Sequence, residues 1–386
     1  MRPFAPIFVP DELAETLSDH AWLEAMLEAE RALVQAEARR GLVSPEAAAA
    51  VVAVLQPDRY DVESLAAEGR EPGNPVEPLV RAIRAQVGDD YAGDVHRGAT
   101  SQDILDTAAV LVARRALRLV DAELATAAAA CARLAEEHRA SVMAARTLLQ
   151  QAVPTTFGYK AAGWLVGVVE ARSGLAAVVL PAQLGGAAGT LAALGADGAE
   201  VLRLYAAELD LPEPVLPWHT RRGPFVELAG RLATAADAVA KIARDVVLLA
   251  QTEVGEVSER DGGSSSTMPH KRNTISAVLT DACARHARAD AALLLESAVH
   301  EHERAVGAWH AEWGALNGAL AATGGAAAAI ARCLERLEVD TARMRANLVP
   351  ETMSEARRFG HDPAGAEEYL GSVDAFIDRA LALHRS

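Results

Sequence analysis

The residues best suited to chemistry lie in one glycine- and serine-rich segment, 261–273, which reads DGGSSSTMPHKRN. Its composition predicts a flexible, hydrated loop that ends at Pro269, before the next helix. A plain linker has no reason to end in His270-Lys271-Arg272-Asn273, which adds an imidazole, two cations and an amide. A loop that carries hydroxyls and cations is what a lid closing over an anionic substrate requires. We therefore predict an active-site loop here.

A second candidate segment, HRGATSQD, begins at His96 and leads into a long predicted helix. Thr100, Ser101 and Asp103 are residue types that cap helices, and capping alone would account for them. Under the alternative hypothesis, these hydroxyls and the backbone amides of the helix N-terminus bind a carboxylate, with His96 or Arg97 beside it. Both interpretations place the segment at the start of a helix.

Two further polar segments need an explanation. Segment 146–156, RTLLQQAVPTT, is interpreted as a turn between bundle helices. Burying its adjacent glutamines without partners would be costly, so Gln150 or Gln151 is expected to face a ligand or a partner backbone. Segment 300–313, HEHERAVGAWHAEW, holds three histidines, but its consecutive His and Glu residues would point around a helix. The H-E-x-x-H spacing of zinc sites is absent, and we predict no metal.

The composition narrows the class of partner. Asp and Glu number 53 against 37 Lys and Arg, and the formal charge of −16 disfavours nucleic acid and anionic membranes. The cations that bind an anionic substrate must therefore be gathered locally. Cys131, Cys283 and Cys333 lie far apart, as buried thiols of a reducing compartment do. We see neither a signal peptide nor an apolar run long enough for a membrane helix, and we expect a cytoplasmic protein.

Long helices must position these segments. Apolar residues make up 51% of the chain and aromatics only 4%, so Ala, Leu and Val must supply the packing, which favours helices. Helices are predicted over 11–40, 105–138, 225–257 and 275–306. The third repeats apolar residues every seven positions, at 228, 232, 235, 239, 242, 246 and 249. Such long apolar faces must be buried against other helices, most simply those of partner subunits.

The glycine-rich run QLGGAAGT, residues 183–190, separates two of the predicted helical regions. It lacks the lysine of a nucleotide-binding phosphate loop and has no strand before it. We therefore expect a tight connection in which small residues permit close packing. Taken alone, the helices would also fit an elongated scaffold without chemistry, but the polar segments between them favour an enzyme.

Together these segments resemble a known enzyme family. Residues 264–273 are similar to the signature G-S-S-x-M-P-x-K-x-N of the fumarase/aspartase superfamily. The segments HRGATSQD, RTLLQQAVPTTFG, QLGGAAGT, LPWHTRR and ERAVGAWHAEW resemble one branch of it, the 3-carboxy-cis,cis-muconate cycloisomerases. The resemblance covers the chain from roughly His96 to Trp313.

The resemblance implies an all-α subunit of three domains. These are an N-terminal helical domain (1–93), a central helical bundle that carries loop 261–273 (94–338), and a shortened C-terminal domain (339–386). It also implies a homotetramer in which each active site combines segments of different subunits. The implied chemistry is addition or elimination across a C–C bond beside a carboxylate of a small polycarboxylate. The reaction passes through an enediolate and uses neither a metal nor an organic cofactor.

Residue by residue, the resemblance places the catalytic serine at Ser265 and the ligands of the substrate carboxylate at Lys271 and Asn273. Further substrate contacts fall on Thr100, Ser101, Gln150 and Arg304. The same segments supply His96 as a second catalytic candidate, and Arg97, Ser266, Met268 and His270 as further substrate-binding candidates. A serine hydroxyl acts as a base only where its alkoxide is stabilised, which Lys271, backbone amides and a helix N-terminus would provide.

Departures from the family pattern bear on the choice of substrate. Leu148 stands where adenylosuccinate lyases carry a histidine, which makes that activity a poor fit. Ser264 occupies the signature's glycine position, Thr274 replaces a proline, and Arg222-Gly223-Pro224 replaces a run like Gln-Arg-Asp-Arg. The sequence favours 3-carboxymuconate cycloisomerisation. Its alternatives are a lyase that releases nitrite or an amine from a substituted succinate, and a non-catalytic helical assembly protein.

Overall fold

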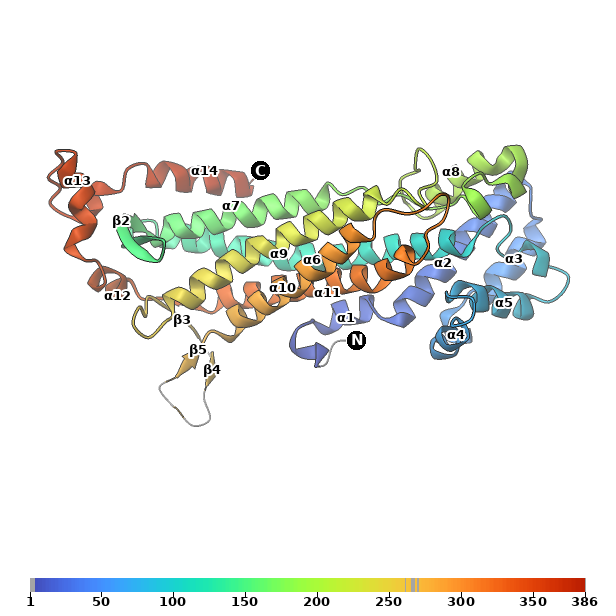
Figure 1. Cartoon of the computed structure of the whole chain (residues 1–386), viewed down its shortest axis with the longest axis horizontal. Coiled ribbons are helices and arrows are strands. Elements are labelled where there is room, and N and C mark those ends of the chain that lie inside the picture. Colours follow the sequence, from blue (N-terminus) through green and yellow to red (C-terminus); the bar gives the residue numbers. More distant parts are fainter. Residues whose placement is uncertain (1–3, 261, 265–267, 269–270, 386) are drawn as a thin grey trace.

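A computed structural model describes residues 4–260, 262–264, 268 and 271–385 and shows an elongated, all-helical molecule (Figure 1). The all-α prediction is confirmed. The strands form three short antiparallel pairs. These are β1 (Val142–Thr147) with β2 (Gln150–Thr156), β3 (Val257–Glu259) with β6 (Leu337–Val339), and β4 (Gly263–Ser264) with β5 (Arg272–Asn273).

Five long helices lie side by side and form a bundle along the long axis (Figure 1). They are α6 (Ser101–Glu137), α7 (Phe157–Ala176), α9 (Gly223–Leu249), α10 (Ile275–Glu296) and α11 (Ala308–Glu335). All seven apolar positions of the α9 repeat are buried, which confirms that seam. Alanines of α9, α10 and α11, including Ala236, Ala284 and Ala322, form a small core of their own. Small side chains let these helices approach closely, which explains a core with so few aromatics.

Shorter helices cover the two ends of the bundle (Figure 1). At one end lie α2 (Asp19–Arg40), α3 (Pro45–Val54), α4 (Val62–Glu68), α5 (Val76–Val87) and α8 (Gly198–Glu208). Helix α1 (Asp11–Thr16) packs on α6 and α11 near the middle of the molecule. At the other end lie α12 (Thr341–Ala346) and α13 (Ser354–Arg358). The last helix, α14 (Val373–Arg385), returns along α7.

Three predicted helices differ from their sequence pattern, one by an interruption and two by an earlier end. The segment 11–40 is broken at Ser18, whose side chain accepts a hydrogen bond from the backbone N–H of Ala21 and so caps a new helix. Helix α9 stops at Leu249, and Val257 belongs to β3 instead. Helix α10 stops at Glu296, because the residues after it bind other parts of the chain, as described below.

Among the described helices, only α11 is long and apolar enough to match a membrane span. The mean hydropathy of its most apolar window is 1.2, and 72% of that window is buried inside the bundle. A Cβ atom at Gly325 would lie 2.0 Å from the carbonyl oxygen of Phe8, so the N-terminal segment packs directly on this helix. Helix α11 therefore has the surroundings of a core helix.

Candidate active site

The segment before α6 is held in place by the side chain of Asp103. Its carboxylate accepts hydrogen bonds from the backbone N–H of Thr100 (3.0 Å), Gly185 (2.8 Å) and Gly186 (2.9 Å). The Nε2 atom of His219 lies 2.6 Å from the same carboxylate. The capping interpretation is confirmed for Asp103, which also joins the start of α6 to two distant segments.

The glycine-rich run 183–190 packs against this helix start, as its sequence predicts. A Cβ atom at Gly186, where φ is +67°, would lie 2.7 Å from the carbonyl oxygen of Gly98. A Cβ atom at Gly185 would lie 2.8 Å from Cε1 of His219. Glycine is therefore required at both positions, because it lets the two backbone amides reach Asp103.

The side chain of Arg304 lies at the same end of the bundle, beside the start of α6. Its Nη1 donates to Oε1 of Gln102 (3.0 Å), and its Nη2 donates to the carbonyl oxygens of Gly186 (2.9 Å) and Ala187 (3.1 Å). Gln102 directly follows Ser101, so the guanidinium lies beside the first turn of α6. A fixed cation next to a helix N-terminus favours the binding of a carboxylate.

The structure corrects the prediction of a helix through His300 and its neighbours. Residues 297–307 leave the helix between α10 and α11, and His302 has a φ of +45°. His300 is buried where its Nε2 lies 3.2 Å from Oε1 of Glu312 and its Nδ1 lies 3.2 Å from the carbonyl oxygen of His219. These contacts, with those of Arg304, tie the segment to other parts of the chain and prevent helical hydrogen bonding. In the described part of the chain, no three His, Cys, Asp or Glu side chains gather as metal ligands would.

Sequence reasoning missed a buried ion cluster centred on Arg222. Its guanidinium donates to both oxygens of Asp106 (2.7 and 3.0 Å) and to Glu312 (2.6 Å at the closest). It also lies 4.7 Å from the ring centroid of Trp218, and Trp309 donates its Nε1 proton to Asp106 (2.9 Å). The one available signal was an arginine in the LPWHTRR segment that departs from the family pattern. Its two carboxylate partners lie 116 and 90 residues away in sequence.

His96 and Arg97 lie near α6 with their side chains bonded to other protein groups. The Nδ1 atom of His96 is 2.6 Å from Oε1 of Glu30. Burial acts to lower the pKa of the His96 imidazole, but the Glu30 carboxylate outweighs it, and the pKa is raised. This favours the imidazolium, a cation that suits carboxylate binding. Arg97 donates to the carbonyl oxygen of Leu42 (2.7 Å) and lies 3.6 Å from Asp94.

Gln150 lies on a β-hairpin, where we expected only a turn between helices. Strands β1 and β2 are joined by Leu148 and Leu149, whose φ values of +51° and +66° form a tight two-residue turn. Gln150 is exposed. Gln151 donates to the carbonyl oxygen of Asn347 (2.7 Å), which confirms that one of the two glutamines binds backbone. Leucines are unusual at positive φ, and here both side chains are exposed.

The described part of the signature loop is its base. Strands β4 and β5 pair Gly263 with Asn273, and the Asn273 side-chain amide donates to the carbonyl oxygen of Gly263 (3.0 Å). A Cβ atom at Gly262 would lie 2.5 Å from the backbone oxygen of Asn273, so glycine permits this close approach. Met268 and Lys271 are exposed. The predicted catalytic residue and two of the predicted ligands lie outside the described residues: Ser265, Ser266 and His270.

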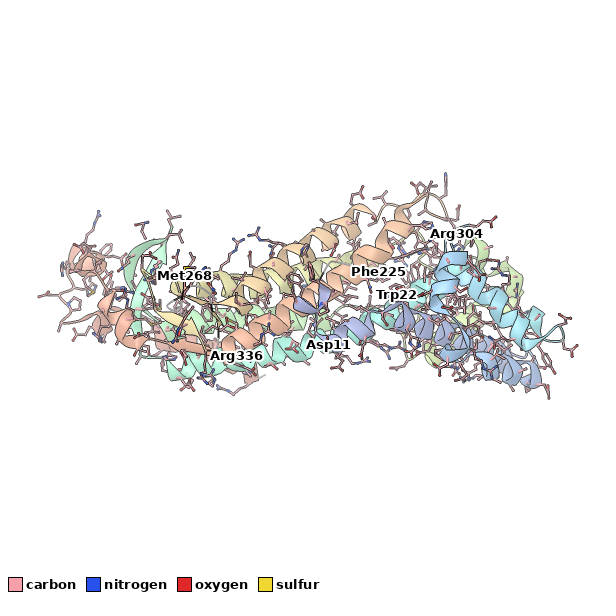
Figure 2. The ribbon with its side chains drawn as sticks, turned by 90° about the horizontal axis from the view of Figure 1, so that it is seen from below. Asp11, Trp22, Phe225, Met268, Arg304 and Arg336 are labelled. Carbon is pink, nitrogen blue, oxygen red and sulfur yellow. The ribbon has the colours of Figure 1, made fainter. Side chains whose placement is uncertain are left out.

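The predicted site residues therefore fall into two groups on one chain. Figure 2 shows Arg304 and Met268 toward opposite ends of the long axis. Helix α9 runs between them, from the Arg222 cluster to the segment that leads into the loop, and its 27 residues span about 40 Å. The first group, near α6, is His96, Arg97, Thr100, Ser101 and Arg304. The second, near the loop, is Gln150, Met268, Lys271 and Asn273.

Comparison with known proteins shows which family this chain is similar to. Residues 9–287 match the family model described as Lyase. The chain is 49% identical to nitrosuccinate lyase of Streptomyces davaonensis over 89% of its own length and 76% of that protein. It is 43% identical to the 3-carboxy-cis,cis-muconate cycloisomerase of Bradyrhizobium diazoefficiens over 98% of its own length and 87% of that protein.

Solved structures agree with these matches. The 3-carboxy-cis,cis-muconate lactonizing enzyme of Pseudomonas putida superimposes with a TM-score of 0.91 and 35% identity, covering 100% of this chain and 99% of that one. A fumarate lyase of Mesorhizobium superimposes with a TM-score of 0.86 and 31% identity, covering 97% and 98%. The chain therefore belongs to the lyase family of the fumarase/aspartase superfamily and is an enzyme of that superfamily.

Proposed function

We propose that this enzyme is a 3-carboxy-cis,cis-muconate cycloisomerase that converts its substrate to a carboxymuconolactone. The observation that carries the proposal is likeness to cycloisomerases along the whole chain, in sequence over 98% of it and in structure over 100%. The geometry near α6 supports a polycarboxylate substrate, because Arg304 lies beside a helix N-terminus in a protein of charge −16.

In the proposed reaction, one substrate carboxylate adds to one carbon of a double bond. The carboxylate that is conjugated with this double bond then becomes part of an enediolate. Ser265 delivers the proton to the enediolate carbon. Lys271 and Asn273 bind the carboxylate that carries the developing charge, and this positive field also stabilises the serine alkoxide. The remaining groups bind and orient the substrate: Thr100, Ser101, Gln150, Arg304, Arg97, Ser266, Met268 and His270, with His96 as the second catalytic group. No metal or organic cofactor takes part.

We further propose that the active site forms only in a homotetramer. The two groups of described site residues lie toward opposite ends of one chain, so a single copy does not bring the base of the loop to Arg304. Exposed apolar side chains on the bundle helices, among them Val247, Val278 and Leu293, are suited to contact other copies. We place the enzyme in the cytoplasm, consistent with its three buried cysteine side chains.

A second activity has specific support. The identity to nitrosuccinate lyase, 49%, exceeds the 43% to the cycloisomerase, although it extends over less of the chain. Release of nitrite from a substituted succinate would use the same proton-transfer serine and the same carboxylate ligands. The departures at Ser264, Thr274 and Gly223 fall in or next to segments that would contact substrate, which leaves room for this alternative substrate.

The two activities are separated by assaying one preparation against both substrates. We expect loss of diene absorbance with 3-carboxymuconate and at least about a thousandfold slower loss with Ser265→Ala. The control Ser354→Ala changes an exposed serine in α13 and should match the wild type. Fumarate release from nitrosuccinate without diene loss would replace the first proposal by the second. Equal rates for Ser265→Ala and wild type would contradict the serine mechanism for either substrate.

A further inference from the structure

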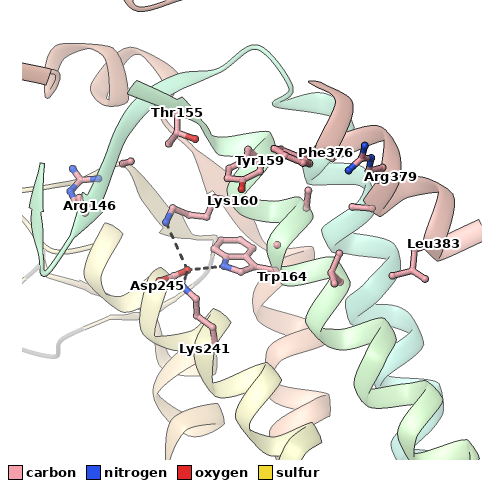
Figure 3. A pocket seen from close by; sticks show the side chains of 15 residues that line it. Arg146, Thr155, Tyr159, Lys160, Trp164, Lys241, Asp245, Phe376, Arg379 and Leu383 are labelled. Carbon is pink, nitrogen blue, oxygen red and sulfur yellow. Dashed lines mark hydrogen bonds and ion pairs between the residues drawn. The ribbon is translucent and has the colours of Figure 1, made fainter. Parts of the chain in front are cut away.

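A cavity of about 650 Å³ lies outside both groups of proposed site residues (Figure 3). Residues of α7, α9, α14 and both strands of the β1–β2 hairpin line it. One part of its wall is aromatic, with Tyr159, Trp164 and Phe376. The volume falls in the range of sites that bind small organic molecules.

Charged side chains converge on the same cavity. The Nζ atom of Lys160 lies 3.9 Å from Oδ2 of Asp245, and Lys241 forms a closer ion pair with the same oxygen. Trp164 donates its Nε1 proton to it as well, at 2.8 Å. Figure 3 shows these three side chains meeting at Asp245, with Arg379 across the cavity beside Phe376.

The cationic side chains that line this cavity outnumber the carboxylates that neutralise them. One carboxylate, Asp245, serves both lysines, and Arg379 has no carboxylate within 4.0 Å among the described residues. Arg146 also lines the cavity, but Glu256 neutralises it through hydrogen bonds of 2.6 and 2.9 Å. Three cations therefore face one carboxylate in a protein whose net charge is −16.

Lysine itself is rare in this chain, which makes its use here informative. Of 37 cationic residues only three are lysines, at 160, 241 and 271. Two of the three line this cavity, although arginine supplies nearly every other ion pair of the protein. A lysine ammonium is a compact charge on a flexible stem, which can turn from Asp245 toward an incoming anion.

We propose that this cavity binds a small organic anion, with its carboxylate or phosphate between Lys160, Lys241 and Arg379 and its apolar body against the aromatic wall. The site is separate from the proposed substrate site. None of the described residues of the proposed substrate site lines the cavity; the nearest lining residue along the hairpin is Arg146, which pairs with Gln151, next to Gln150. The proposal does not depend on which substrate the enzyme converts.

The test uses the purified, assembled enzyme and three probes: inorganic phosphate, succinate and pyridoxal 5′-phosphate. Binding is measured by calorimetry for the wild type and for Lys241→Gln, Arg379→Gln and Lys271→Gln. Arg385→Gln is the matched control, because Arg385 is an exposed arginine on α14 that does not line the cavity. We expect saturable binding of at least one probe. Its Kd should rise about tenfold in Lys241→Gln and in Arg379→Gln, and less than twofold in the other two.

Covalent labelling then locates the bound probe. The aldehyde of pyridoxal 5′-phosphate condenses with a lysine amine to an imine and water, and borohydride reduces the imine to a stable secondary amine. Burial lowers the pKa of Lys160, which increases the share of its reactive neutral amine. Because the chain has only three lysines, peptide mapping gives an unambiguous position. We expect the label on Lys160 or Lys241 and its suppression by the anion that binds.

Three results would overturn the proposal. One is the absence of saturable binding of all three probes up to about 10 mM, a range that covers even weak ligands. Another is binding that Lys271→Gln abolishes and Arg379→Gln leaves intact, which would assign the anion to the substrate site. The third is labelling confined to Lys271.

Discussion

At the scale of single residues, Glu37 is the least expected feature of the region near α6. Its carboxyl is fully buried, and neither oxygen has a hydrogen-bond partner among the described residues. Burial raises the pKa of Glu37 from 4.5 to about 8; Arg97 acts against this rise, while Glu30 and Asp94 add to it. The structure therefore holds an uncharged carboxylic acid beside a proposed substrate-binding segment.

This acid gives the protein a defined dependence of stability on pH. Between about 4.5 and 8 the folded state keeps a proton on Glu37 that the unfolded chain releases, so stability declines as the pH rises through that window. Glu37→Gln stays neutral at every pH. At pH 8 we expect its free energy of unfolding to exceed that of the wild type by about 2 kcal/mol or more. At pH 4.5 the two should be equal.

Urea unfolding at both pH values and one fixed protein concentration measures this effect. The control Glu24→Gln changes an exposed glutamate on the same helix and should show no such pH dependence. A variant less stable than the wild type at pH 8 would mean that Glu37 is ionised in the folded protein.

Residue types predicted those contacts of the site whose two partners are close in sequence. Asp103 caps Thr100 three residues away, and the pattern of capping residues sufficed to find it. Arg222, His219 and His300 were missed as members of a buried cluster. The carboxylate partners of Arg222 and His219 lie 90 to 116 residues away, and His300 leaves its predicted helix to reach the backbone of His219, 81 residues away. No local pattern encodes such contacts. Nor did the sequence show that the Glu37 carboxyl has no hydrogen-bond partner in the described part of the chain.

At the scale of elements, the Arg222 cluster joins three bundle helices at one end. Asp106 belongs to α6, Glu312 belongs to α11, and Arg222 immediately precedes α9. All three side chains are almost completely buried. Removing the cation would leave two carboxylates without a counter-charge in a region of low dielectric.

For Arg222→Met we therefore expect a loss of about 3–5 kcal/mol of stability and a clearly lower midpoint of thermal unfolding. The matched control, Arg231→Met, removes an exposed arginine of α9 that pairs weakly with Glu227 at 3.9 Å, and should cost less than about 0.5 kcal/mol. Equal midpoints for the two variants would show that the cluster does not stabilise the packing of these helices.

The spacing of apolar residues predicted which segments form helices, but it did not predict where those helices end. The seven-residue repeat identified the buried seam of α9, because burial along a bundle imposes that spacing directly. The end of α10 at Glu296 was missed, since His300 and Arg304 leave the helix to bind distant groups. The β1–β2 hairpin was missed for a related reason: its tight turn uses two leucines at positive φ, where Asn and Gly are the usual signal.

At the scale of the whole molecule, the main finding is the separation of the two groups of site residues. The group near α6 and the group near the signature loop are about 40 Å apart along α9. Residue spacing alone does not reveal this separation, and the sequence indicated it only through the resemblance to a family whose sites combine segments of different subunits. The proposed reaction requires that different copies of the chain supply the two groups to each active site.

Co-expression of two inactive variants tests this requirement most directly. Ser265→Ala and Arg304→Gln are produced together with different affinity tags, and only assemblies that carry both tags are assayed on the substrate that the wild type converts. Each variant alone should be inactive. In mixed assemblies, sites that combine an intact loop with an intact Arg304 should restore about a quarter of the wild-type rate. The control pair, Ser265→Ala with Lys271→Gln, damages every loop and should restore nothing. No recovery in the first pair, with assembly intact, would contradict the shared site.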